Sequence, residues 1–269
     1  MTENNNSRLR LTIRVGRQTL AFAQTDGADE TAVTYEPFVV KSGVSMAANL
    51  REAFKTNDLL LQTTTQRARV LIDTDVLVVP VELFSEDTMD DMMHHAFPDT
   101  AADAVAYNVM PYLNAVGVFA VNRDLRLVLD DHFRDVQLLA ALGPVCHHLH
   151  QRSFTGTARK LYAYFHEKRL DVMCFQQNRF KFYNAFEAGR TYDALYFLLY
   201  VWKQLQLSAQ QDELHLVGDI PEPERIMQQL RRFVQKVFVV NPQADFQQSP
   251  VAGVKGMPYD LMTLLAKGR

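Results

Sequence analysis

The sequence is poor in cysteine and has no excess of charge of one sign. Its two cysteines, Cys146 and Cys174, lie far apart and belong to no Cys-x-x-Cys pair, which argues against a disulfide framework or a thiolate metal site. The formal net charge is -3 over 269 residues, and both signs are mixed along the chain. The charge therefore gives no case for binding nucleic acid or an anionic membrane.

Long apolar runs are also missing. The longest, residues 192–202, contains Asp193, is followed by Lys203 and is too short to cross a bilayer. The first ten residues, MTENNNSRLR, have no apolar run behind their charges, unlike a signal peptide. We therefore expect a cytoplasmic protein without membrane insertion and without a nucleic-acid partner. With 48% hydrophobic residues, the chain can fill the core of one large domain or two ordinary ones.

Apolar periodicity predicts alternating strands and helices in the first half. Residues 8–15 alternate strictly, with Leu9, Leu11, Ile13 and Val15 on one face. Ser45 is a candidate N-cap, and Ser85 is another, followed by acids in a first helical turn. Strands are expected at 8–15, 18–25, 32–40, 68–73, 76–84, 104–110, 115–121 and 135–142, and helices at 45–56, 85–97 and about 122–133.

The pattern restarts after Gly143-Pro144. Three consecutive strands are expected at 160–167, 169–176 and 180–187, followed by a strand at 212–220 and a last one at 238–242. A strongly apolar helix begins at Thr191, and its stripe includes Tyr192 and Tyr196, so we expect this helix to be buried. Pro221 and Pro223 introduce a second helix that is predicted to end near residue 236.

Both halves therefore follow the order strand-strand-strand-helix-strand-helix-strand. This order predicts an α/β fold of two similar halves, each with a mixed sheet, stacked around a cleft. The first half is expected at 8–143 with an inserted subdomain at about 76–121, the second half at 158–245, and a C-terminal tail at 246–269 that packs on the fold.

This element order resembles the actin-like ATPase superfold, a duplicated ribonuclease H-like fold, over nearly the whole chain. The insertion lies where pilus- and secretion-assembly members of the superfold carry one. More narrowly, the stretches VLVVPVELF at 76–84 and GMPYDLM at 256–262 resemble a bacterial family of uncharacterised proteins, domain-of-unknown-function family 3822. That resemblance implies the fold and no known activity.

Active members of the superfold hold phosphates and magnesium on two hairpins with an Asp-x-Gly turn. The first hairpin of this chain reads Arg14-Val15-Gly16, with arginine at the carboxylate position. Magnesium-assisted hydrolysis needs a carboxylate to place the metal or its water, and an arginine would repel the metal. The resemblance therefore implies the fold but argues against the ATPase.

The second hairpin and the adenosine turn depart from the family pattern as well. The second hairpin reads Tyr164-Phe165-His166, and the turn after LHLV has the single glycine of Gly218-Asp219 instead of Gly-Gly. Several of these residues could still hold a phosphate without hydrolysing it. The candidate residues for a cleft or nucleotide site are Arg14, Gly16, Arg17, His166, Lys168, Gly218 and Asp219.

No other motif points to a catalytic or metal centre. His147 and His150 would be neighbours on a helix, but no cluster of further ligands stands out, so we interpret them as surface residues at a helix end. The acids Asp73 and Asp75 lack the first-strand carboxylate that a two-metal nuclease needs. We predict no catalytic residues, no metal and no cofactor, with ATP or ADP kept as an alternative ligand.

The arginines on the polar face of the first strand, Arg8, Arg10 and Arg14, would need partners if this strand is central in its sheet. They could point into the cleft, pair with acidic segments or meet another molecule, or they could extend to solvent at a sheet edge.

The resulting hypothesis is a non-catalytic interaction or scaffold protein with degenerate phosphate motifs, which binds a protein partner and could form a homo-oligomer. One alternative is a nucleotide-binding switch or weak ATPase with altered cleft residues. Another is a small-molecule transferase of the sugar-kinase type, for which Asp219 and Glu167 are the candidate general bases.

Overall fold

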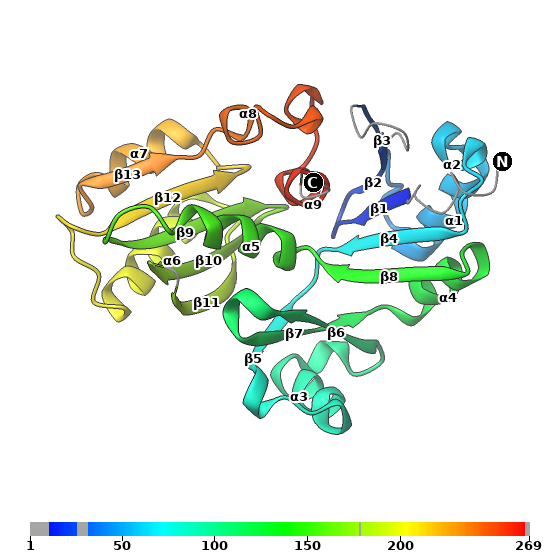
Figure 1. Ribbon diagram of the computed structural model, residues 1–269, viewed down its shortest axis with the longest axis horizontal. Coiled ribbons are helices and arrows are strands. Elements are labelled where there is room, and N and C mark those ends of the chain that lie inside the picture. Colours follow the sequence, from blue (N-terminus) through cyan, green and yellow to red (C-terminus); the bar gives the residue numbers. More distant parts are fainter. Residues whose placement is uncertain (1–10, 26–31, 178, 267–269) are drawn as a thin grey trace. The chain divides into compact units, whose positions relative to one another are not determined.

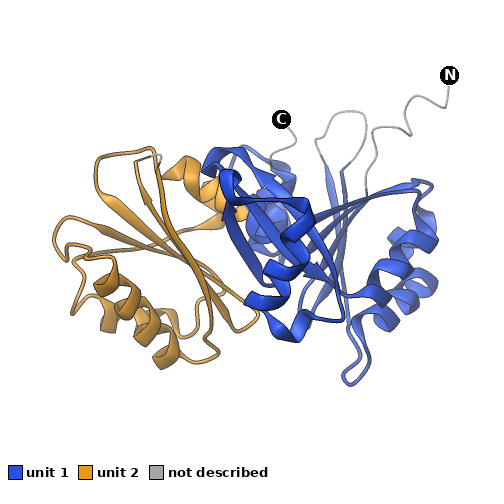
Figure 2. Ribbon diagram, turned by 90° about the horizontal axis from the view of Figure 1, so that it is seen from below, with its two compact units in different colours: residues 1–144, 246–269 blue, residues 145–245 orange. Residues whose placement is uncertain are grey.

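The computed structural model of the protein describes residues 11–25, 32–177 and 179–266 (Figure 1). The chain divides into two compact units (Figure 2), of which unit 1 comprises residues 1–144 and 246–269 and unit 2 comprises residues 145–245. The predicted mixed α/β class is confirmed, since each unit contains a five-stranded sheet with parallel and antiparallel neighbours.

The sheet of unit 1 has the strand order β3-β2-β1-β4-β8. Its first three strands form an antiparallel meander, and β4 and β8 continue it in parallel from β1. The strands are β1 (Leu11–Val15), β2 (Leu20–Thr25), β3 (Val33–Phe38), β4 (Arg67–Ile72) and β8 (Asp135–Ala140). The helices between them are α1 (Met46–Thr56), α2 (Asp58–Gln62) and α4 (Arg123–His132). Ser45 caps α1 as predicted, because its side chain accepts a hydrogen bond from the backbone N–H of Ala48.

A second, three-stranded antiparallel sheet of order β5-β7-β6 lies between β4 and β8 in the sequence. It consists of β5 (Val76–Pro80), β6 (Ala104–Met110) and β7 (Ala115–Val121), and α3 (Met89–Ala96) packs on it around the buried side chain of Met93. Asn108 of β6 joins the two sheets of unit 1, since its amide donates to the carbonyl of Leu138 and accepts from the N–H of Ala140, both at 2.9 Å.

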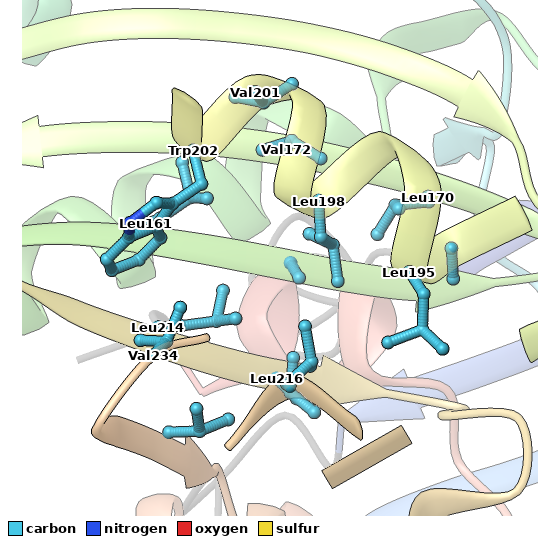
Figure 3. Close-up of a cluster of buried hydrophobic side chains, with 14 of the residues drawn as sticks. Leu161, Leu170, Val172, Leu195, Leu198, Val201, Trp202, Leu214, Leu216 and Val234 are labelled. Atoms are coloured by element: carbon cyan, nitrogen blue, oxygen red, sulfur yellow. The ribbon is translucent and has the colours of Figure 1, made fainter. Parts of the chain in front are cut away.

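Unit 2 repeats the topology of the first sheet with the order β11-β10-β9-β12-β13. Its strands are β9 (Arg159–His166), β10 (Arg169–Gln176), β11 (Arg179–Glu187), β12 (Glu213–Gly218) and β13 (Lys236–Val239). The helices are α5 (Leu142–Arg152), which starts before the unit boundary, α6 (Thr191–Gln204), α7 (Pro223–Leu230) and α8 (Pro242–Asp245). Figure 3 shows Leu195, Leu198 and Trp202 of α6 pointing toward Leu161 and Leu216 of the sheet, where they form one hydrophobic core.

The chain then returns to unit 1 through residues 246–266, which contain the 3-10 turn η5 (Pro250–Gly253) and the helix α9 (Tyr259–Leu265). Every residue of α9 is buried. A helix that is buried on all sides needs a partner for each charge it carries, and α9 carries Asp260.

The structure differs from the predicted elements in several places, and it contains the helices α2, α8 and α9, which the periodicity did not predict. Residues 81–83 form the 3-10 turn η1 (Val81–Leu83) instead of extending β5, which ends at Pro80. Helix 85–97 is split into the 3-10 turn η2 (Glu86–Thr88) and α3, and the Ser85 side chain makes no capping hydrogen bond. α7 ends at Leu230, so β13 begins earlier than expected, at Lys236. α6 is buried on one face only, because Tyr192 and Tyr196 are exposed.

Candidate functional site

The first hairpin is closed by a backbone hydrogen bond of 2.8 Å from the N–H of Gly16 to the carbonyl of Thr19. A second backbone hydrogen bond, of 2.9 Å from the N–H of Asp73 to the carbonyl of Val15, connects the hairpin to the end of β4. Gly16 therefore forms a tight turn at the end of the sheet where β1 and β4 terminate.

Arg14 lies on the central strand of this sheet, is 2% exposed and forms a bidentate ion pair with Asp260 of α9, which is fully buried. Its Nε lies 2.8 Å from Oδ1, and its Nη2 donates to Oδ2 at 2.8 Å. Nη1 donates to the hydroxyl of Thr19 at 2.7 Å. The fork geometry matches the planar carboxylate, which is the arrangement in which arginine binds an acid most specifically.

Arg14 therefore pairs with an acid of its own unit, one of the alternatives that the sequence left open. Arg8 and Arg10, the other arginines of the predicted basic face, lie outside the described residues. Arg17, the next candidate, is 30% exposed and its Nη2 lies 3.7 Å from a carboxylate oxygen of Asp75.

The second hairpin joins β9 and β10 through a two-residue turn. Glu167 and Lys168 both have positive φ angles, 42° and 67°, which is the left-handed region that favours glycine. The turn thus fixes the backbone of Lys168. The carbonyl of Lys168 accepts a hydrogen bond from the N–H of Ala188 at 2.9 Å.

His166, the third candidate on this hairpin, is part of a buried charge cluster. Its Nε2 lies 3.0 Å from Oδ2 of Asp171, while Nε of Arg169 donates to Oδ1 of the same carboxylate at 3.0 Å. The ring of Tyr164 stacks on the imidazole with centroids 4.5 Å apart. Burial acts to raise the pKa of Asp171, but His166 and Arg169 outweigh it and hold that pKa below its ordinary value.

Gly218 ends β12 next to the second hairpin. Its φ angle is +83°, and a Cβ atom added to it would lie 2.2 Å from the carbonyl oxygen of Phe165 and 3.0 Å from the ring of Tyr164. The N–H of Asp219 donates to the same carbonyl at 2.8 Å. Packing within unit 2 therefore requires glycine here, whether or not an adenosine approaches the backbone.

The structure brings the seven candidates together in two groups. Arg14, Gly16 and Arg17 lie near the end of β1 in unit 1. The other four lie at one end of the sheet in unit 2, because β9 and β12 run in parallel with Phe165 beside Gly218. Sequence reasoning missed the acids that pair with Arg14 and His166, which are Asp260 and Asp171. The signal for Asp171 was available, since it interrupts the apolar strand RLDVMCFQ.

These residues do not fit a magnesium nucleotide of the kind that the superfold implies. At the first turn, the position expected to hold a carboxylate carries a guanidinium that is bound to Asp260. At the second turn, His166 packs against Asp171 and the glycine of the adenosine turn packs against Tyr164. Among the described residues, no group of three or more histidine, cysteine or acidic side chains is arranged to hold a metal ion.

The histidines near the end of α5 correct one expectation. His150 is not a surface residue: it is buried, with its ring 5.0 Å from that of Phe154 and 5.5 Å from that of Phe175. His148 instead lies 2.9 Å from a carboxylate oxygen of Asp245, which also binds Arg152. This arrangement attaches α8 to α5 within unit 2.

The family described as "Protein of unknown function (DUF3822)" matches residues 1–237. The chain belongs to this family. A Bacteroides thetaiotaomicron protein with actin-like ATPase fold and unknown function has 25% sequence identity and a TM-score of 0.81, over 95% of this chain and 99% of that one. A search of curated protein sequences finds no match.

A more distant likeness is to a structure of the PilM-PilN type IV pilus biogenesis complex, with 14% identity and a TM-score of 0.57, over 96% of this chain and 97% of that one. These likenesses confirm the predicted actin-like fold. In the part of the chain that the structure describes, no helix has the length and apolar character that crossing a membrane requires.

We expect the Arg14–Asp260 pair to tolerate joint replacement but not the loss of one partner. Asp260→Asn leaves a buried guanidinium without its counter-charge and should lower the free energy of unfolding by about 3–5 kcal/mol. Arg14→Met combined with Asp260→Leu should recover most of that loss. Urea unfolding measures both, with Asp130→Asn as control, because its exposed pair with Arg126 should be worth less than about 1 kcal/mol. If Asp260→Asn and the control Asp130→Asn lowered the free energy of unfolding equally, this account would be contradicted.

The lowered pKa of Asp171 predicts a dependence of stability on acid pH. An aspartate with a lowered folded pKa stabilises the protein above its unfolded pKa of about 3.9, and this contribution is lost as the pH falls through the folded value. Asp171→Asn should therefore be less stable than the wild type at pH 7, and the difference should shrink below about pH 4. Thermal unfolding across pH measures it, with the exposed Asp91→Asn as control. A difference that stays constant with pH would rule out this role.

Gly218→Ala should destabilise unit 2 through both backbone conformation and steric overlap, by about 3 kcal/mol. Gly156→Ala is the matched control, because Gly156 has a φ angle of +73° and no heavy atom within 4 Å of the added Cβ position. The control should lose only the conformational part, about 1 kcal/mol. Chemical denaturation of both variants provides the comparison, and similar losses would show that the Phe165 carbonyl does not restrict this position.

Proposed function

We propose that the protein is a non-catalytic interaction or scaffold protein that uses the actin-like fold to bind a protein partner. The observation that carries this proposal is the buried ion pair between Arg14 and Asp260. At the position where an ATPase of this superfold needs a carboxylate, the chain has an arginine, and its own C-terminal helix supplies the acid that binds it.

The second hairpin supports the same proposal. A phosphate on this turn would have to compete with Asp171 for His166, and the two interact at 3.0 Å inside the unit. A buried ion cluster that loses one partner is destabilised by several kcal/mol, so opening it for a ligand is costly. Arg14 of the first hairpin and His166 of the second are thus both engaged in internal contacts, whereas Arg17 and Lys168 are exposed.

The distant likeness to PilM agrees with this reading as an analogy. That protein is seen in a complex with a protein partner, PilN. Since its identity to this chain is 14%, the likeness concerns the fold, and a fold can serve many functions.

Calorimetric titration with ATP and ADP, with and without magnesium, tests the proposal against the nucleotide-switch alternative. We expect no saturable binding tighter than about 100 µM, which corresponds to roughly 5–6 kcal/mol, and no release of phosphate from ATP. Binding tighter than about 100 µM that Arg17→Ala weakens would favour the nucleotide-switch alternative, and ATP hydrolysis that Arg17→Ala lowers would overturn the non-catalytic proposal. Arg126→Ala is the matched control, because it also removes an exposed arginine that faces an aspartate.

A further inference from the structure

The outer face of α6 carries a stripe of exposed tyrosines. Tyr192, Tyr196 and Tyr200 follow one another at four-residue spacing and are 64%, 65% and 49% exposed. Residues four apart lie on the same side of a helix, so the three rings form one continuous strip. The opposite face of α6 is already used, because Leu198 and Val201 are buried in the core of unit 2 (Figure 3).

The strip is held in place before any partner binds. Arg225 of α7 lies over the ring of Tyr192, 4.8 Å from its centroid, and its Nη2 donates to the tyrosine hydroxyl at 2.6 Å. Glu222 fixes that arginine through Nη1 at 2.7 Å. The rings of Tyr196 and Tyr200 are nearly parallel, with an interplanar angle of 15° and centroids 6.1 Å apart. Side chains that are ordered in advance lose less entropy on binding.

The charges beside the strip make this face complementary to itself. Asp193 stands at its N-terminal end and Lys203 at its C-terminal end, and both are exposed. If two copies of α6 pack antiparallel around a two-fold axis at the level of residue 198, Asp193 of each copy lies at the level of Lys203 in the other. Tyr196 then lies at the level of Tyr200. A parallel pairing would instead place like charges at the same level.

We propose that this face is a homodimer interface, in which α6 packs antiparallel on α6 of a second copy of the chain. An isologous interface requires a surface that is complementary to itself, and the face has that property in charge and in aromatic content. The proposal is independent of whether the protein binds a nucleotide or a further partner.

The exposed area indicates a dimer of modest affinity. Aromatic side chains bury about 150–250 Å² each, so at the observed exposures the three tyrosines offer on the order of 350 Å² per copy. A standard interface buries about 800 Å² per partner. The tyrosines therefore supply somewhat under half of a standard interface, and Asp193, Lys203, Gln204 and Arg225 extend it.

Sedimentation velocity of the full chain over a concentration series tests the proposal. We expect a concentration-dependent monomer–dimer equilibrium, and Tyr196→Asp should raise the dimer Kd by at least about tenfold, because it places two like charges near the two-fold axis. Leu127→Asp is the matched control, since it adds the same charge at an exposed apolar residue of α4 in unit 1 and should leave the Kd unchanged. Circular dichroism confirms that each variant is folded.

A charge swap tests the antiparallel register itself. Asp193→Lys and Lys203→Asp should each weaken the dimer, because each places like charges at one level, and the double variant should restore it. A chain that stays monomeric up to about 100 µM, a range in which weak homodimers with Kd values near 10 µM are populated, would overturn the proposal. So would a dimer that Tyr196→Asp leaves intact, or single-variant defects that the double variant does not reverse.

Discussion

A buried charge on a central strand is the constraint on which unit 1 depends. β1 has neighbours on both sides and all five of its residues are buried, yet it carries Arg14. Such a charge must be paired, and the acid comes from Asp260, 246 positions further along the chain. The return of the chain to unit 1 after it completes unit 2 brings this acid to the guanidinium. A buried pair of this kind contributes little net stability against an apolar core, but its bidentate geometry favours the placement of α9 that satisfies the guanidinium.

Unit 2 also contains a buried charge, and there the partners are close in the sequence. Asp171 is buried on β10, and its partners His166 and Arg169 lie within five residues of it, around the hairpin turn. The fold thus places one buried ionisable side chain at each hairpin, Arg14 at the first and His166 at the second, and in both cases the protein itself supplies the partner. The hairpin geometry is therefore compatible with a purely structural role. A phosphate bound by Arg14 or His166 would have to displace contacts that already exist.

The bounds of several strands were predicted well, whereas the burial of His150 and the exposure of the outer face of α6 were not predicted. β6, β7 and β10 have the predicted bounds because turn residues limit them on both sides. The end of β5 was predicted too late because the strand ends at Pro80, inside an apolar run. Proline has no backbone N–H to donate to a neighbouring strand, and the periodicity of apolar residues does not take this into account. At the site, the departure from the phosphate motif could be seen from Arg14 alone. The partner of Arg14, Asp260, could not be predicted, because a pairing across 246 positions leaves no local pattern in the sequence.

The tyrosines of α6 are the reason why the sequence predicted this helix to be buried. Its ring counts as apolar in any periodicity argument, so a helix rich in tyrosine is predicted to be buried on most of its surface. Its hydroxyl, however, lets the ring lie at a wet surface at a lower cost than a phenylalanine ring, which has no polar tip. Phe197, the phenylalanine of α6, is accordingly half-buried and stacks on Phe186, whereas Tyr192, Tyr196 and Tyr200 face outward. The division of the aromatic residues of α6 between an inner and an outer face thus follows their chemistry, and a surface that combines ring area with hydroxyl groups is suited to contacts that form and dissociate.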